Sequence, residues 1–158
     1  MKIFFFLFYF YSGSLWSFNL VCNFEEVYQN GDIQQGTIWV QNEDFRYQYD
    51  DIDLYTIISK NKNFFLIDNK YQNVQRVSEK NDTFALLLKV FDDFPNFKEV
   101  YQNEKVTIKI ENSDIIFIRR ISIISNQANL SLNFYSCKNK SILEKKYFDY
   151  LDFKKYKY

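Results

Sequence analysis

Histidine is absent from this chain of 158 residues, and proline, glycine and cysteine are scarce. Without histidine, the chain lacks the commonest metal ligand and the usual general base near neutral pH. Only Gly31 and Gly36 follow the amino-terminal segment, so the sequence contains no glycine-rich loop of the kind that binds phosphate. Two isolated cysteines without histidine also argue against a structural metal site. We therefore expect no cofactor, no metal ion and no catalysis.

The charged residues balance, with 20 Lys and Arg against 20 Asp and Glu. No overall field therefore favours nucleic acid or an anionic membrane, and the basic tail Lys154-Lys155-Tyr156-Lys157 is too short to predict a nucleic-acid partner. Three acidic pairs, Glu25-Glu26, Asp50-Asp51 and Asp92-Asp93, lie beside predicted turns or a helix end. Acids exposed to solvent are ordinary there, so we expect no paired-carboxylate active site.

A secretory signal peptide over residues 1–14 is indicated by a basic start, the apolar run Ile3–Tyr11 and the small residues that follow it. Cleavage after Ser17 is the second choice. Export would place residues 15–158 in the periplasm as a single domain. The alternative is an uncleaved membrane anchor, because the apolar character continues to Val21.

Cys22 and Cys137 lie near opposite ends of the expected domain. In an exported chain, two cysteines most simply form one disulfide. Closing so long a loop would contribute about 4–5 kcal/mol by the chain-entropy model. Two separate buried thiols are the alternative.

Residues Gly36–Val77 carry the clearest secondary-structure signal. Short segments with alternating apolar residues follow one another, separated by Asn, Asp, Gln and Lys, which is typical of an antiparallel meander with one apolar face. Asn30-Gly31 is a strong hairpin signal just before it, and Gly36 predicts a bulge or bend within a strand. The strands expected along the chain are Cys22–Tyr28, Asp32–Val40, Phe45–Tyr49, Leu54–Ser59, Phe64–Asp68, Asn73–Val77, Glu104–Glu111, Ile115–Ser125 and Leu130–Cys137.

One amphipathic helix is predicted at about residues 82–93, because its apolar residues recur with helical spacing and Pro95 follows its end. Residues 141–158 are expected to form a short strand or turn and a loose end. The result is one antiparallel sheet of about nine or ten strands, too long to stay flat and too wide for one helix to cover. Its aromatic surface either closes on itself as a barrel core or holds an apolar ligand.

Two ordered segments, GTIWVQNEDFRY (residues 36–47) and LYTIISKNKNFFLID (residues 54–68), resemble the periplasmic lipoprotein-carrier family, LolA and its relatives. The first is similar to the family's Gly-Thr-apolar-Trp-apolar and Phe-Arg-aromatic strands, and the second to its apolar run, turn and aromatic pair. Phe24 and Tyr28-Gln29 are loosely similar to the strand before the family's Asn-Gly turn. The resemblance implies a mainly β fold with one or two helices: an open, unclosed antiparallel β-barrel or half-barrel, covered by a lid helix, with a cavity for lipoprotein acyl chains.

The resemblance also implies that Trp39, Phe45 and Tyr47 line the cavity or its rim. Because strand residues two apart share a face, Tyr49 joins Phe45 and Tyr47, although alternation does not say which face points inward. The candidate cavity residues, of which the last four belong to the lid helix, are Trp39, Phe45, Tyr47, Tyr49, Phe64, Leu66, Phe84, Leu87, Leu88 and Phe91.

The chain departs from the family pattern in two places. The family has Arg-Pro between the Trp strand and the Phe-Arg strand, and that Arg helps to latch the lid; here the position holds Gln41-Asn42-Glu43. The family also begins with an amphipathic helix, for which Leu15–Val21 is too short. We expect a lid that closes less firmly.

Together these observations predict a periplasmic, non-enzymatic carrier that binds lipoprotein acyl chains, or another lipid, for transfer toward the outer membrane. Its expected partners are membrane-bound donor and acceptor proteins, without nucleic acid, and the carrier is expected to be a monomer. The alternative is a secreted or envelope-associated β-scaffold with a fully packed core. A third interpretation is a membrane-tethered accessory to an enzyme.

Overall fold

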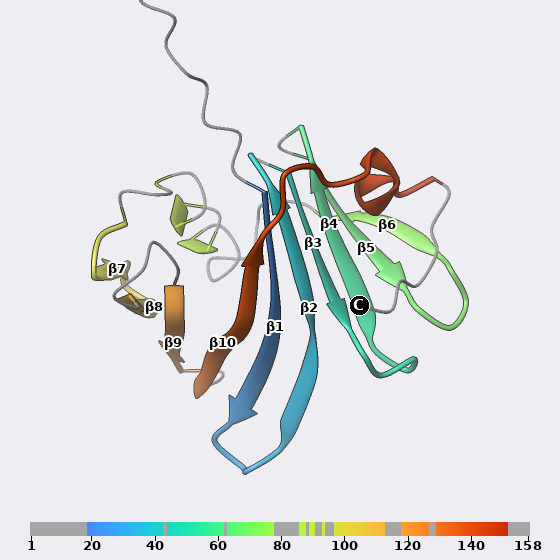
Figure 1. The fold of residues 1–158 in the computed structure, drawn as a ribbon. Coiled ribbons are helices and arrows are strands. Elements are labelled where there is room, and N and C mark those ends of the chain that lie inside the picture. Colours follow the sequence, from blue (N-terminus) through green and yellow to red (C-terminus); the bar gives the residue numbers. More distant parts are fainter. Residues whose placement is uncertain are drawn as a thin grey trace, which may run out of the picture.

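The computed structural model describes residues 19–42, 44–61, 63–77, 86–87, 89–90, 93, 97–112, 118–126 and 129–151. Within them, one antiparallel sheet has the strand order β6-β5-β4-β3-β2-β1-β10-β9-β8-β7 (Figure 1). The strands are β1 (Asn19–Tyr28), β2 (Ile33–Gln41), β3 (Asp44–Tyr49), β4 (Tyr55–Lys60), β5 (Asn63–Asp68), β6 (Val74–Val77), β7 (Val100–Gln102), β8 (Val106–Asn112), β9 (Ile118–Ser125) and β10 (Asn129–Asn139). This confirms the predicted fold class, a mainly β chain whose sheet stays open.

The sheet is open because β6 and β7 form its two edges and do not pair with each other in the described part of the chain. The first and last long strands, β1 and β10, lie side by side at its centre (Figure 1). Strands β2 to β6 extend from β1 on one side, and β9 to β7 extend from β10 on the other.

The meander forms because its turns carry the residues that tight turns require. Gly31 has a φ of 89° at the β1–β2 turn, Asn42 a φ of 53° at the β2–β3 turn and Asn61 a φ of 51° at the β4–β5 turn. Glycine and asparagine tolerate this left-handed region better than other residues. The predicted strands of residues 32–77 therefore match β2 to β6 closely.

The disulfide between Cys22 and Cys137 is confirmed, with Cα atoms 4.1 Å apart. It joins β1 to β10 where the register between these strands shifts, so that β10 carries one extra residue. Ser136, with a φ of 52°, lies at this bulge. The two cysteines are thus neighbours in space despite a sequence separation of 115.

The side of the sheet that carries the largest apolar cluster is called the inner face. Residues from both halves of the sheet meet there, and Leu86 and Val90 from the segment between β6 and β7 pack onto it. The buried members of this cluster are Leu20, Cys22, Phe24, Ile38, Phe45, Tyr47, Phe64, Leu86, Val90, Tyr101, Val106, Ile108, Ile110, Ile121, Ile123 and Leu132.

On the opposite side, the outer face, the chain that follows β10 covers part of the sheet, over β1 to β5. This chain crosses the ends of the central strands to the short 3-10 helix η1 (Lys145–Phe148) (Figure 1). Leu143 and Phe148 pack there against Val21 and Trp39 in a second buried cluster. For residues 141–158 the sequence predicted a short strand or turn and a loose end. The structure shows the 3-10 helix η1 and packed side chains up to Tyr150, and residues 152–158 lie outside the described residues.

Three further predictions, for the helix, Gly36 and the signal peptide, have different outcomes. The described residues of the predicted helix, 86–87 and 89–90, are helical. Gly36 was expected to mark a bulge, but the pairing of β2 with both neighbours is regular there. The signal peptide of residues 1–14 lies outside the described residues. No helix in the part of the chain that the structure describes is long and apolar enough to cross a membrane.

Candidate functional site

Five of the predicted cavity residues share the inner face. Phe45, Tyr47 and Phe64 are buried in the large cluster, and Tyr49 packs against it while partly exposed. Leu66 is half-buried and lies directly opposite Ile57, which also packs against the cluster. The pairing of the strands brings these side chains to one side of the sheet, as the alternation predicted.

Trp39 lies elsewhere, and its predicted position is corrected by the structure. It faces outward, opposite Val21 on β1 and Arg46 on β3. Its ring stacks on Tyr147 with centroids 5.7 Å apart and is only 1% exposed. Because Ile38, Trp39 and Val40 are all apolar, alternation does not show which of them faces inward. In the structure, Trp39 belongs to the contact with the η1 segment.

The lid-helix residues are only partly placed. Leu87 packs against the inner cluster while partly exposed, and Phe84, Leu88 and Phe91 lie outside the described residues. Leu86 and Val90, which the sequence reasoning treated only as a widening of the apolar stripe, are the buried contacts of this segment, 9% and 0% exposed.

A carboxylate surrounded by tyrosines lies at one end of the inner face, and sequence reasoning missed it. Glu26 is 7% exposed. Its Oε1 accepts a hydrogen bond from the Tyr47 hydroxyl at 2.7 Å, and its Oε2 accepts bonds from the hydroxyls of Tyr28 at 2.6 Å and Tyr49 at 2.9 Å. We call these four residues the Glu26 cluster.

Gly36 makes this arrangement possible, since Tyr47 and Tyr49 on β3 must reach over β2 to meet Glu26 on β1. A Cβ atom at Gly36 would lie 2.1 Å from the Gln48 carbonyl oxygen and 2.5 Å from Cζ of Phe24. In the space thus left, the Phe24 ring stacks on Tyr47 with centroids 3.9 Å apart. The glycine therefore serves close packing, which its position in the strand alone did not reveal.

The tyrosines of the Glu26 cluster hold their protons firmly. Burial raises the pKa of the Tyr28 hydroxyl to about 12, with the hydrogen bond to Glu26 as the next cause. Burial, followed by the negative charge of Glu26, raises the pKa values of Tyr47 and Tyr49 well above the usual range. At neutral pH all three hydroxyls are therefore hydrogen-bond donors to the carboxylate.

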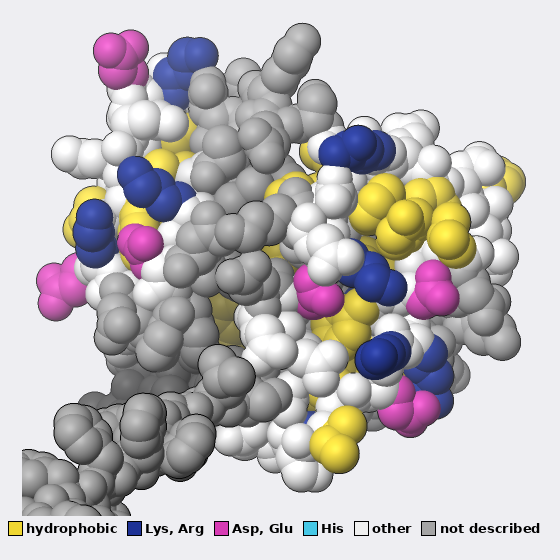
Figure 2. Space-filling view, turned by 90° about the horizontal axis from the view of Figure 1, so that it is seen from above, with side chains coloured by type: hydrophobic (Ala, Val, Ile, Leu, Met, Phe, Trp, Pro, Cys, Tyr) yellow, Lys and Arg dark blue, Asp and Glu magenta, His cyan; other side chains and the backbone are white. Residues whose placement is uncertain are grey.

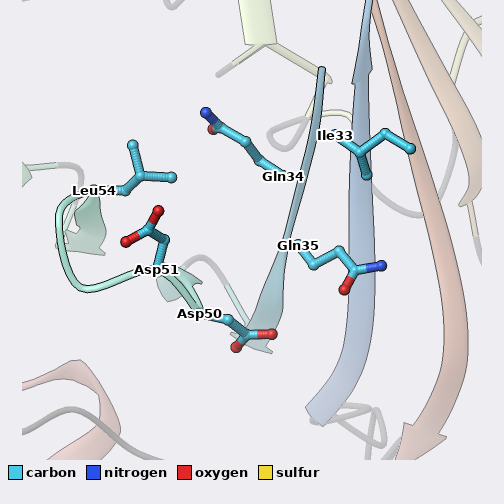
Figure 3. A pocket seen from close by; sticks show the side chains of 6 residues that line it. All are labelled: Ile33, Gln34, Gln35, Asp50, Asp51 and Leu54. Carbon is cyan, nitrogen blue, oxygen red and sulfur yellow. The ribbon is translucent and has the colours of Figure 1, made fainter. Parts of the chain in front are cut away.

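A pocket of about 400 Å³ adjoins the Glu26 cluster. It is lined by Ile33, Gln34, Gln35, Asp50, Asp51 and Leu54. In Figure 3 the side chain of Gln34 points toward Asp51 and Leu54, across the space between β2 and the β3–β4 turn. Gln34 also lies opposite Glu26 in the strand register, and its Oε1 is 3.5 Å from the Tyr28 hydroxyl. Gln34 thus connects the pocket to the buried carboxylate.

The described side chains at one end of the molecule carry charges of both signs (Figure 2). At the end of the molecule seen in Figure 2, basic and acidic side chains alternate around patches of apolar ones. Among the described residues, no three His, Cys, Asp or Glu side chains lie close enough together to hold a metal ion.

No family model and no curated protein sequence matches this chain. Among solved structures it is similar to a DUF1329 family protein from Desulfovibrio piger. That protein is 8% identical in sequence, and the match covers 84% of this chain and 90% of that chain with a TM-score of 0.47.

Proposed function

We propose that this protein is a periplasmic carrier that holds acyl chains of lipoproteins, or of another lipid, on the inner face of its open sheet. The observation that carries the proposal is an apolar face that the described chain covers incompletely. Ten side chains that pack against the inner cluster remain partly exposed: Val40, Tyr49, Ile57, Val77, Leu87, Phe97, Ile118, Leu130, Phe134 and Cys137.

Energetics favour an apolar occupant on such a face. Each CH₂ group of an acyl chain that leaves water gains about 0.8 kcal/mol. A chain of ordinary length therefore gains enough to offset the cost of its own ordering. Release to an acceptor protein requires the occupant to leave again, which suits a face whose cover is a short apolar segment such as Leu86–Val90.

The disulfide supports a location outside the cytosol, because disulfides persist in oxidising compartments. It agrees with the expected signal peptide and with the periplasm as the working compartment. We further propose that the carrier acts as a monomer between membrane-bound donor and acceptor proteins.

A pair of neighbouring residues on β5 tests the proposal. Leu66 lies on the inner face, whereas the ring of Phe65 stacks on Tyr150 on the outer face with centroids 3.6 Å apart. Leu66→Gln should weaken the binding of a fluorescent acyl probe about tenfold, since it removes apolar contact area from the site. Phe65→Gln, the matched control, should leave probe affinity unchanged. Equal effects of the two variants would contradict an inner-face site.

The packed inner cluster favours a second candidate, a non-catalytic envelope scaffold. Phe24, Val90, Ile108 and Ile121 are fully buried, as in an ordinary core. Native mass spectrometry of protein purified from the periplasm separates the two candidates, because a carrier retains lipid and a scaffold has the mass of the bare chain.

A further inference from the structure

The charge of Glu26 lacks a cationic partner. Its three hydrogen-bond partners are hydroxyls, and no lysine or arginine in the described chain pairs with it. At Glu26 a negative charge would lie among neutral donors, with 7% of the residue exposed, in a region of low polarity. Such a charge attracts a cation more strongly than an exposed one does.

The adjoining pocket adds further negative charge. Two of its six lining residues, Asp50 and Asp51, are acidic, and none is basic. The side chain of Gln34 belongs to both places, since it lines the pocket and lies opposite Glu26. The pocket therefore meets the edge of the Glu26 cluster at Gln34, whose Oε1 lies 3.5 Å from the Tyr28 hydroxyl.

The other side of Glu26 is apolar. Leu132 on β10 lies directly opposite it, and Phe24 precedes it on the same face of β1. The Phe24 ring packs on Tyr47 and Tyr49, whose hydroxyls point to the carboxylate. A ligand that extends from the pocket along the inner face would thus meet negative charge first and apolar surface next.

We propose that the pocket and the Glu26 cluster form a head-group site for an ammonium group, so that the preferred ligand is an amphiphile with an ammonium head and an acyl tail. The ammonium group donates hydrogen bonds to the Glu26 carboxylate and to the tyrosine oxygens, which can still accept them. The aromatic faces of Tyr28 and Tyr49 add cation–π attraction. This inference rests on the proposed carrier function and names the class of its ligand.

The test compares three fluorescent probes with the same acyl chain and an ammonium, a hydroxyl or a carboxylate head. The wild-type chain should bind the ammonium probe about tenfold more tightly than the hydroxyl probe, the size expected for a hydrogen bond to a charged group. Glu26→Gln should abolish this preference, so that the ratio of the two affinities falls to about one. Asp51→Asn, on the pocket wall, should reduce the preference for the ammonium probe about threefold.

Glu25→Gln is the matched control. Glu25 neighbours Glu26 on β1 but points to the other face, where it accepts a hydrogen bond from Gln35 at 3.2 Å in an exposed position. This variant should keep the full preference for the ammonium probe. Circular dichroism of each variant checks that it folds, and Asp51→Asn carries the test alone should Glu26→Gln fail to fold.

The outcomes separate this inference from the carrier proposal. Equal binding of all three probes would overturn the head-group site and leave the carrier proposal standing. If no acyl probe binds, the carrier proposal fails. In that case n-butylammonium still tests the site, since a rise in the melting temperature of the wild type, absent from Glu26→Gln, would support it and no rise would overturn it.

Discussion

The inner and outer faces of the sheet each carry a buried apolar cluster, but the two clusters are covered in different ways. On the outer face, the chain's own continuation covers the cluster of Val21 and Trp39. The Lys140 amide donates to the Asn19 carbonyl at 2.8 Å, and the Arg46 guanidinium donates to the Tyr147 carbonyl at 3.1 Å. The inner face has a packed centre surrounded by half-buried apolar side chains, with a buried carboxylate at one end.

This difference indicates which face is structural and which can exchange its cover. Hydrogen bonds from the backbone and a stacked Trp39–Tyr147 pair hold the outer cover in one position. On the inner face the described contacts of the segment near residues 86–90 are apolar and non-directional, and contacts of that kind are more easily replaced by a ligand. The predictions below act on one face at a time.

The largest effect is expected from Gly36→Leu, which should destroy the inner face. Its side chain would have to displace the Gln48 backbone and the Phe24 ring, and overpacking of this degree should cost more than about 4 kcal/mol. We expect insoluble protein or a chain that unfolds at low urea concentration. Gly31→Asn is the control, because nothing lies within 4 Å of its Cβ position and asparagine tolerates positive φ. A soluble, stable Gly36→Leu chain would contradict the packing described here.

Removal of the disulfide should affect both faces. Cys137 packs on the inner cluster shortly before the chain turns toward the outer face. The double variant Cys22→Ser, Cys137→Ser should lose about 4 kcal/mol of unfolding free energy, as expected for a loop of 115 residues. Urea unfolding, followed with and without a reductant on the wild type, gives the comparison. A loss below about 1 kcal/mol would mean that the unfolded chain gains little freedom.

Trp39→Ala should loosen the outer face selectively. The loss of a fully buried indole ring should cost about 3 kcal/mol, and hydrogen exchange should rise in residues 141–151. Affinity for an acyl probe should stay the same, because Trp39 lies away from the inner face. Trp39→Phe keeps an aromatic ring against Tyr147 and should lose less stability. Weaker probe binding in a folded Trp39→Ala chain would instead mean that Trp39 contributes to the ligand site.

The sequence predicted the strands well where turns and alternation agreed. Asn30-Gly31 and the polar turns between residues 41 and 63 placed β2 to β5, and the export signal with two cysteines predicted the disulfide. Strand β7 was missed because its three residues, Val100–Gln102, are too few to show a period. The η1 cover was missed because its packing depends on Trp39 facing outward, which local sequence does not specify.

The site was harder to predict than the fold. Glu26 belongs to an acidic pair, and such pairs are usually exposed. Its burial depends on Tyr47 and Tyr49, more than twenty residues further along the chain, and on the missing side chain of Gly36 between them. No local pattern carries this information, because the contact crosses a whole strand.

The smallest effect concerns the pH dependence of the Glu26 cluster. A tyrosine whose pKa is raised in the folded state keeps its proton above pH 10, where the unfolded chain loses it, so the unfolded state binds fewer protons. The contribution of these tyrosines to stability should therefore be constant below about pH 10 and fall above it, by up to about 1.4 kcal/mol per pH unit for each of Tyr47 and Tyr49. For Tyr28 the decline should end near its folded pKa of about 12.

Urea unfolding across this range, together with tyrosinate absorbance, measures the effect. Glu26→Gln should lower the pH at which Tyr47 ionises, but only in part, because burial is the largest cause of its raised pKa and the charge of Glu26 comes second. Tyr71→Phe, at a position that is 68% exposed, should leave the stability profile unchanged. If Glu26→Gln left the ionisation of Tyr47 unaltered, the carboxylate would not act on the hydroxyl that contacts it.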